Sequence, residues 1–415
     1  MVRRIISDMF DPSLIKNDFP IFNRTVNDKP LVYLDSGATS QKPKIVLDAE
    51  REYYEQHNAN VHRGAHTLGD EATGMLRRAR SVVAMFIGAR ETETIFVRNT
   101  TEAINLVAYS WGLDNLRAGD VILSTEMEHH ANLVPWQQVA KRTGATIELV
   151  KVTRDGLLDP EDYARKLKLK PKLVVIVHVS NALGTINPVK EMTKAARGVG
   201  AVVLIDGAQA VPHMKINVCE LGCDFYVFSG HKMLGPMGIG VLWGKKEILN
   251  SMTPFLTGGG MINEVYHDHS TWIDLPDKFE AGTPNVAGAV GLMTAVKYLE
   301  KLGMEQVRRH DQEIVGYTIN KLGNVDNVRL LGPIDEKFRS GSVSFEYLGV
   351  HGHDVATVLD SEGVAVRSGH HCTMVLHNAL GLAATVRASF NVYTTKEDID
   401  TLVVALDKVK KVFGK

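Results

Sequence analysis

Short apolar runs alternate with longer amphipathic stretches from about residue 30 to residue 245. The runs predicted to be strands are 31–34, 94–97, 121–124, 147–150, 173–177, 202–205, 225–228 and 239–242. The amphipathic stretches, typical of helices, include 71–86, 102–111, 134–143 and 189–199. Several runs are apolar throughout, as expected of strands buried on both sides. The alternation therefore predicts an α/β fold, with a mainly parallel sheet and helices on both of its faces.

The pattern changes near residue 290. Two long helical patterns follow one another, and isolated apolar runs then alternate with helices to the end; these segments are 287–301, 304–321, 340–346, 364–367 and 385–390. Thr395 and Asp398 have the spacing of a capping box and open a last amphipathic helix that runs to Val412. We interpret residues 28–290 as a large domain, and residues 1–27 with 291–415 as a smaller α+β domain.

Charge and cysteine content exclude several classes of protein. The formal net charge of −1 gives no basic face for nucleic acid or acidic lipid, and no apolar run approaches the ~20 residues of a membrane span. The basic start is followed by Asp8 and Asp11, which makes it a poor signal peptide. Only three cysteines occur. This small, odd number argues against a framework of disulfide bonds. We expect a cytoplasmic protein without nucleic-acid or membrane partners, although an organellar origin stays open.

An acid and a lysine follow two neighbouring predicted strands. Asp206 comes directly after the run 202–205. Lys232 follows the run 225–228, in a stretch that contains few acidic residues. Strand ends of this kind usually face a ligand crevice. A lysine that bonds an aldehyde and a carboxylate that pairs with a ring nitrogen are what pyridoxal phosphate requires. Gln209 would contact the ring oxygen. Asp206 taken alone is better explained as a loop acid that caps the next turn. Lys232 taken alone is also compatible with a solvated lysine in a turn.

A strand-to-helix turn offers donors for a phosphate. Thr100 and Thr101 follow the run 94–97 and open an amphipathic stretch, so backbone N–H groups and the positive end of a helix dipole would face an anion. Ser229 and His231 would complete this cradle. Taken by itself, the turn is better explained as a plain helix cap.

His129 and Cys372 supply further chemistry. An imidazole just after the run 121–124 could stack on the ring and shuttle protons. Cys372 follows His370 and His371, and its thiolate would be favoured if either imidazole were protonated. A thiolate there could take a sulfur atom as a persulfide. The local sequence alone is equally compatible with an inert cysteine and with a reactive one.

Eight sequence strings occur in the order found in one enzyme family. They are NVHRG (60–64), TTEAINL (100–106), MEHHAN (127–132), HVSNALGT (178–185), DGAQA (206–210), SGHK (229–232), FEAGTPN (279–285) and RSGHHC (367–372). With them the chain, from about residue 17 onward, resembles the Suf-type (group II) cysteine desulfurases of the class V aminotransferase superfamily. These are fold-type-I pyridoxal-phosphate enzymes with an aspartate aminotransferase-like fold, and the resemblance implies a seven-stranded sheet in the large domain.

The resemblance also implies an activity and its residues. L-cysteine would give L-alanine and a persulfide on Cys372, which passes its sulfur to a Suf-type acceptor protein for iron–sulfur cluster assembly. Lys232, Cys372 and His129 would be catalytic. The cofactor would contact Thr100, Thr101, His129, Asn181, Asp206, Gln209, Ser229, His231 and Lys232, and also Thr283 of the other subunit in a homodimer with shared sites. The substrate would contact His62, Arg63, Asn181, Arg367 and Arg387.

One position departs from the family. Val375 stands where the family loop has proline, and it removes a backbone restraint from the cysteine loop. Two alternatives stay open: another pyridoxal-phosphate enzyme of this superfamily, such as a selenocysteine lyase, and a scaffold without catalysis. The histidine pairs 267/269 and 351/353 lack the spacing of a zinc motif, so we expect no metal.

Overall fold

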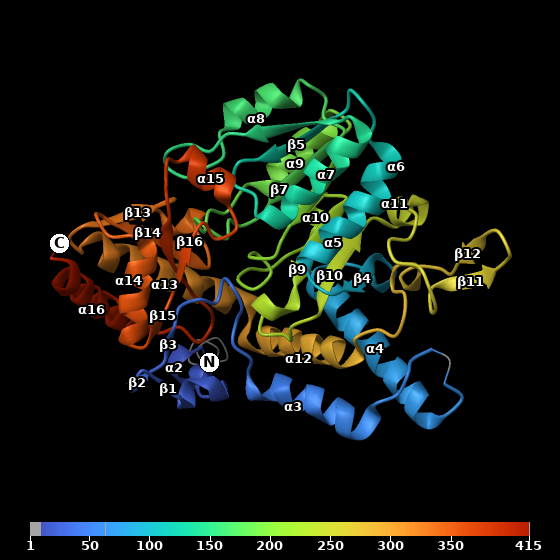
Figure 1. Cartoon of the computed structure of the whole chain (residues 1–415). Coiled ribbons are helices and arrows are strands. Elements are labelled where there is room, and N and C mark those ends of the chain that lie inside the picture. Colours follow the sequence, from blue (N-terminus) through green and yellow to red (C-terminus); the bar gives the residue numbers. More distant parts are fainter. Residues whose placement is uncertain (1–9, 63, 415) are drawn as a thin grey trace, which may run out of the picture.

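The computed structural model describes residues 10–62 and 64–414 (Figure 1). Seven strands form its main sheet, in the order β4 (Thr94–Val97), β10 (Gly240–Gly244), β9 (Phe225–Ser229), β8 (Val202–Asp206), β7 (Leu173–Val177), β5 (Val121–Thr125) and β6 (Thr146–Val150). Strands β9, β8, β7, β5 and β6 are parallel, whereas β10 is antiparallel to both of its neighbours. The predicted mainly parallel, seven-stranded sheet is therefore confirmed.

The direction of β10 follows from the short connection that precedes it. Only residues 230–239 join β9 to β10, and a parallel neighbour would need a longer crossover. The connection contains the turn Gly230–Lys232, so the predicted lysine lies between two adjacent antiparallel strands.

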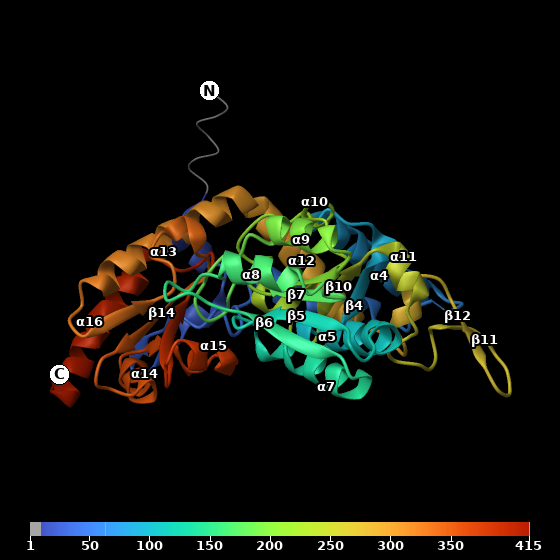
Figure 2. The same cartoon turned by 90° about the horizontal axis from the view of Figure 1, so that it is seen from above.

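Helices cover both faces of this sheet (Figures 1 and 2). On one face lie α4 (Thr67–Phe86), α8 (Pro160–Leu167), α9 (Val189–Gly198) and α12 (Val286–Leu302), and on the other α5 (Thr100–Val107) and α7 (Val134–Thr143). In α4 the buried positions Ala72, Leu76, Ala79 and Val83 recur at helical spacing. This apolar stripe is why the segment packs on the sheet as a helix.

A second sheet is wholly antiparallel. Its order is β13 (Val328–Leu331), β14 (Ser342–Tyr347), β17 (Thr385–Ser389) and β16 (Arg367–Gly369), and it packs with α13 (Met304–Gly323), α14 (Gly352–Ser361) and α16 (Lys396–Phe413). The capping box predicted at Thr395 and Asp398 is confirmed at the start of α16. Apart from the β3–β15 pair, the other α-helices and strands are α2 (Pro12–Lys16), β1 (Thr25–Val26), β2 (Lys29–Pro30), α3 (Lys44–Glu52), α6 (Leu113–Asn115), α10 (Val218–Leu221), α11 (Lys246–Ser251), β11 (Ile262–Val265), β12 (Ser270–Trp272) and α15 (Met374–Ala379).

The predicted strand at 31–34 does not join the main sheet. Its central part, β3 (Val32–Tyr33), pairs in parallel with β15 (Val364–Ala365) beside the second sheet. An apolar run shows that a strand forms but not which sheet it completes, which is why its place in the alternation was misleading. Earlier in the chain, Lys16 of α2 forms a 2.7 Å ion pair with Asp398 of α16.

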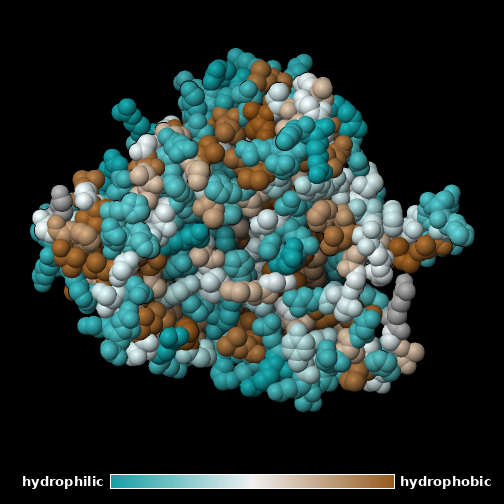
Figure 3. Space-filling view, in the orientation of Figure 1, coloured by the Kyte–Doolittle hydropathy of each residue, from teal (hydrophilic) through white to brown (hydrophobic). Residues whose placement is uncertain are grey.

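The boundaries at residues 27 and 290 stay predictions, and residues 1–9, with the basic start, lie outside the described part. None of the described helices is long and apolar enough to cross a membrane. Figure 3 shows hydrophobic residues interspersed among hydrophilic ones on the face drawn there.

Candidate active site

A cavity of about 200 Å³ lies at the carboxyl ends of β5, β7, β8 and β9, beside β16 and β17. Most of the predicted site residues line it: Thr100, Thr101, His129, Asn181, Asp206, Gln209, Ser229, His231, Lys232, Arg367 and Arg387. Gly37 and Ala38 line it too, and neither was predicted. Residues that are far apart in the sequence therefore share one pocket.

Lys232 and Asp206 are the central charged pair. Lys232 Nζ has no hydrogen-bond or ion-pair partner among the described residues. Burial lowers the pKa of Lys232 to about 8, against the opposing attraction of Asp206, and Arg387 and Arg367 lower it further. Asp206 is 3% exposed, and burial raises its pKa although its Oδ1 accepts a 3.0 Å hydrogen bond from Ala208 N. The site thus provides an amine that is partly neutral near physiological pH.

The start of α5 forms a polar cradle. Ser229 Oγ accepts a 2.9 Å hydrogen bond from Thr100 N and lies 2.6 Å from Thr100 Oγ1. Asn99 caps the helix by accepting from the backbone of its first turn, and Thr101 lies exposed beside the cavity. Burial and the nearby Lys232 lower the pKa of His231 to about 4, so its imidazole is neutral. Hydroxyls, amides and a helix N-terminus together suit an anion.

His129 is held as a neutral ring in one tautomer. Burial lowers its pKa to about 3, with a further contribution from Lys232. Its Nδ1 accepts a 3.0 Å hydrogen bond from Ala131 N, which leaves the ring proton on Nε2. His129 can therefore donate a hydrogen bond at Nε2 without carrying a charge.

A buried acid, Glu128, supports this wall and was missed by the sequence analysis. Its carboxyl group accepts hydrogen bonds from Thr125 Oγ1, Asn132 Nδ2 and Val177 N at 2.6–2.9 Å. Burial raises the pKa of Glu128 to about 8 despite these three donors. The contacts join β5 to β7 at the strand ends that face the cavity.

Two arginines face the cavity from paired strands. Arg367 of β16 lies opposite Arg387 of β17 in the antiparallel register. Arg387 is 1% exposed; its Nη1 donates to Asn181 O at 2.7 Å and its Nη2 to Asp35 Oδ1 at 2.9 Å. Arg387 Nε is buried and has no hydrogen-bond partner in the part of the chain that the structure describes. Asp35 was not predicted, although its position directly after an apolar run is the signal that singled out Asp206.

The loop that contains Cys372 joins β16 to α15 and is hydrogen-bonded to the segments that follow β5 and β7. His130 N donates to Cys372 O at 2.8 Å, and Asn181 Nδ2 donates to His371 O at 2.6 Å. His371 and Cys372 have φ values of 50° and 60°, a left-handed conformation that costs energy in residues other than glycine. Val375, at the position where proline was expected, is the second residue of the short helix α15 (Met374–Ala379).

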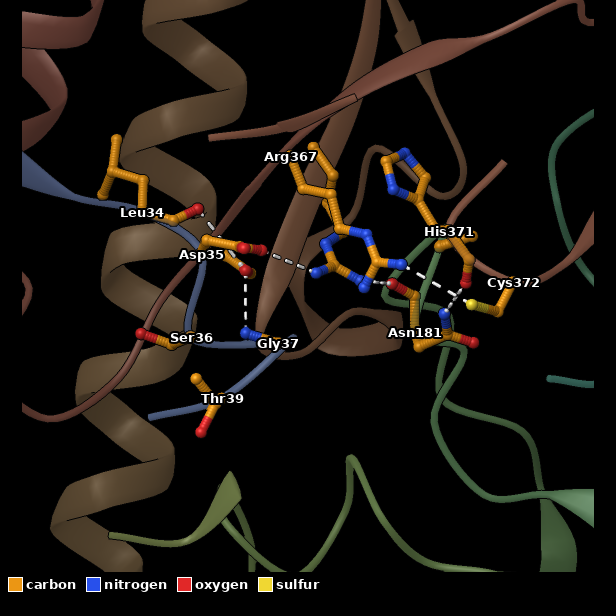
Figure 4. Close-up of polar contacts among 12 residues, drawn as sticks. Leu34, Asp35, Ser36, Gly37, Thr39, Asn181, Arg367, His371 and Cys372 are labelled. Carbon is orange, nitrogen blue, oxygen red and sulfur yellow. Dashed lines mark hydrogen bonds and ion pairs between the residues drawn. The ribbon is translucent and has the colours of Figure 1, made fainter. Parts of the chain in front are cut away.

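The charge beside Cys372 comes from an arginine. Arg367 Nη2 donates to Cys372 Sγ at 3.5 Å, and Figure 4 shows the two side chains facing each other. Burial lowers the pKa of His371 to about 2, with Arg387 adding to the effect. The expectation that an imidazolium could favour the thiolate is therefore wrong for His371, because a buried ring next to arginines stays neutral.

Comparisons with known proteins agree on one family. The sequence profile described as aminotransferase class-V matches residues 32–402. A probable cysteine desulfurase of Halalkalibacterium halodurans is 53% identical over 96% of this chain and 98% of its own length. A cysteine desulfurase of Haloferax volcanii is 47% identical over 97% and 98%.

The chain belongs to the class V aminotransferase family, among its cysteine desulfurases. Solved structures agree. The apo cysteine desulfurase of Thermococcus onnurineus NA1 superposes with a TM-score of 0.92 at 41% identity, covering 97% of this chain and 99% of that one. The cysteine desulfurase CsdA of Escherichia coli, in an S-sulfonic acid form, gives 0.89 at 36% identity, covering 98% and 100%.

Members of this class V family use pyridoxal 5′-phosphate, and the cavity fits it. The cradle at α5 suits a phosphate, Asp206 suits a protonated ring nitrogen, and Lys232 is a free buried amine. Asn181 Oδ1 is a buried acceptor that has no donor within the described residues. Gln209 Nε2 donates to Gly37 O at 2.8 Å and keeps one N–H for the ring oxygen.

Four predicted residues lie away from the cavity wall or outside the description. Cys372 is partly exposed and stands beside Arg367 without lining the cavity. Thr283 is exposed and borders a different hollow, near α5 and β10. His62 is exposed, and its backbone N donates to Thr73 Oγ1. Arg63 lies outside the described residues.

Proposed function

We propose that this enzyme removes sulfur from L-cysteine, releases L-alanine and holds the sulfur as a persulfide on Cys372. The observation that carries the proposal is the 3.5 Å contact between Arg367 Nη2 and Cys372 Sγ, at a cavity that also contains Lys232 and Arg387. A cation next to a partly exposed cysteine stabilises the thiolate, which is the nucleophilic form. The names of its relatives, at about half identity over nearly the whole chain, support the same reaction.

Bound pyridoxal phosphate supplies an electron sink for the substrate's Cα. Asp206 would pair with the ring nitrogen and keep it protonated, and His129, whose ring proton lies on Nε2, would donate a hydrogen bond into the site. Lys232, with a pKa of about 8, accepts the Cα proton and later returns a proton on the path to alanine. Arg387 and Asn181 bind the substrate carboxylate.

The transfer of sulfur is a reaction between the sulfur of the substrate and the sulfur of Cys372. Cys372 Sγ forms a bond to the substrate sulfur as the Cβ–S bond breaks, and the electron pair of that bond stays on the carbon side until a proton arrives. Arg367 Nη2, 3.5 Å from Cys372 Sγ, places a positive charge beside the attacking sulfur. The persulfide is a reversible cap, so the sulfur can be passed to a second thiol.

Replacing the nucleophile tests the proposal. In Cys372→Ala, alanine release from L-cysteine and protein-bound persulfide should both fall to background while the visible band of the bound cofactor stays. Cys219→Ala is the matched control because Cys219 is an exposed free cysteine remote from the cavity. Full persulfide formation by Cys372→Ala would exclude Cys372 as the sulfur carrier. Selenocysteine supplied in parallel measures whether the selenium analogue is a better substrate.

The partners form a second part of the proposal. By the family resemblance, we expect a homodimer in which Thr283 reaches the partner's cofactor phosphate. Thr283 is exposed and does not line the cavity of its own chain, which leaves it accessible to a second subunit. We also expect a sulfur-acceptor protein in the cytoplasm, serving iron–sulfur cluster assembly. Sedimentation at several concentrations tests the dimer, since a monomer with full activity would contradict shared sites. Transfer of labelled sulfur to a purified acceptor tests the second partner.

A further inference from the structure

A short segment before α3 connects the two sheets at the active site. This connecting segment consists of residues 34–40. Its Ser36 N donates to Ser389 O of β17 at 3.2 Å, and Gly37 N donates to Ser389 Oγ at 2.8 Å. At its other end, Ser40 Oγ accepts from Leu234 N at 2.8 Å. The segment therefore contacts the strand of Arg387 and the turn of Lys232 at the same time.

Asp35 is the charged residue of the connecting segment, and it fixes one side of a buried guanidinium. Its carboxylate accepts from Arg387 Nη2 at 2.9 Å, while Asn181 O accepts from Nη1 at 2.7 Å. The side chain of Arg387 is 1% exposed and that of Asp35 is 24% exposed. A planar guanidinium with an acceptor on each terminal nitrogen cannot rotate without losing a charge-assisted hydrogen bond.

Backbone packing restricts the same guanidinium. A Cβ added to Gly37 would lie 3.2 Å from Arg387 Cζ and 3.1 Å from Ser389 Cβ, so there is no space between the connecting segment and the guanidinium. Arg387 is thus confined by Gly37, by Asp35 and by Asn181 O.

The neighbouring arginine is not held in this way. Arg367 lies opposite Arg387 in the strand register, but it has no carboxylate partner among the described residues, and its terminal nitrogen contacts Cys372 Sγ. The two arginines therefore differ in function: Arg367 is available to the sulfur atoms, whereas Arg387 is pre-oriented.

We propose that Asp35 is a positioning residue that holds Arg387 in the orientation that receives the substrate's α-carboxylate, and so makes the enzyme select amino acids over simple amines. This inference rests on the proposed function, which places an α-amino acid in the cavity. Binding energy that depends on orientation is lost when the receiving group can rotate. The loss should therefore appear only for ligands that contain a carboxylate.

The test compares two ligands that differ by that group alone. The visible band of the holoenzyme is titrated with L-alanine and with ethylamine, which is alanine without its carboxylate. In Asp35→Asn, we expect the Kd for L-alanine to rise at least about tenfold, because hydrogen bonds to the charged carboxylate are lost. The Kd for ethylamine should change less than about twofold. Turnover of L-cysteine should show a higher KM and a kcat that is nearly retained.

Two further variants make the result specific. Gly37→Ala displaces the guanidinium without a change of charge and should reproduce the selective loss of L-alanine binding, which also covers the case that Asp35→Asn does not fold. In Arg387→Lys, adding Asp35→Asn should weaken L-alanine binding less than about twofold, because the positioned group is already absent. Glu346→Gln is the matched control, since it releases exposed Arg329 on β13 and should change neither titration.

Unchanged or tighter L-alanine binding in Asp35→Asn would overturn the inference, and so would equal losses for the two ligands. Failure of the proposed function looks different. In that case the unaltered enzyme forms no alanine or persulfide from L-cysteine, while the L-alanine and ethylamine titrations still decide the role of Asp35.

Discussion

Replacing Lys232 by methionine should stabilise the apoenzyme in a pH-dependent way. Burial lowers the pKa of Lys232 from 10.5 to about 8, so the folded protein binds this proton less tightly than the unfolded chain does. At 1.36 kcal/mol per pH unit, that difference amounts to about 3 kcal/mol of folding free energy lost whenever the amine is charged. Methionine has a similar length and no charge, so the variant should recover this energy.

The sign determines the pH window. Below about pH 8 the amine is charged in both states, and the folded protein bears the full cost of burying it. Between about pH 8 and pH 10.5 the unfolded chain binds more protons than the folded one, so the stability of the unaltered protein rises with pH. The advantage of Lys232→Met should therefore be largest near neutral pH and should lose its electrostatic part above pH 10.5.

Urea unfolding of both apoenzymes over this pH range measures the difference. Other groups that titrate at alkaline pH are common to both proteins and cancel. Lys190→Met is the control, because Lys190 is exposed on α9 and its replacement should give a difference that does not vary with pH. A stability difference between Lys232→Met and the unaltered protein that stays constant from neutral to alkaline pH would refute the reasoning.

Two further changes test the packing and the electrostatics of the site. Gly207→Ala places a Cβ in steric overlap with Cε1, Cζ and the hydroxyl oxygen of Tyr226, a fully buried side chain. It should destabilise the protein by about 2 kcal/mol or more and weaken cofactor binding, as measured by urea midpoint and visible absorbance. Retained stability would show that Tyr226 can move away. Arg367→Gln removes the cation next to Cys372 and should slow alkylation of this cysteine by iodoacetamide about tenfold at neutral pH, as scored by mass spectrometry. An unchanged rate would mean that Arg367 does not stabilise the thiolate.

The sequence predicted the main sheet because its strands are consecutive and buried on both faces. Asp206 and Lys232 were found since each follows such a strand, and the structure brings both to one cavity. The same logic fails for the run 31–34, which pairs with β15. The apolar pattern of this run is compatible with pairing in any sheet, and only tertiary contacts determine which strand it pairs with.

Contacts between residues of the two sheets could not be predicted from the sequence. Nothing local indicates that Asp35 meets Arg387, or that Arg367 rather than His371 supplies the charge beside Cys372. The neutral state of His371 depends on burial among other cations, a property of the assembled site. Predicted roles for Thr283 and His62 stay predictions, because these two residues do not line the cavity. The predicted role of Arg63, which lies outside the described residues, stays a prediction too.

The connecting segment has a consequence for the order in which the enzyme matures. Asp35 and Arg387 are 352 residues apart, whereas the strands of the main sheet lie between residues 94 and 244. During synthesis the main sheet can form while β17 is still inside the ribosome, but the ion pair cannot. The main sheet and the turn that contains Lys232 can thus form before the ion pair between Asp35 and Arg387. A nascent chain stalled before residue 385 would present a cofactor pocket without its pre-oriented arginine.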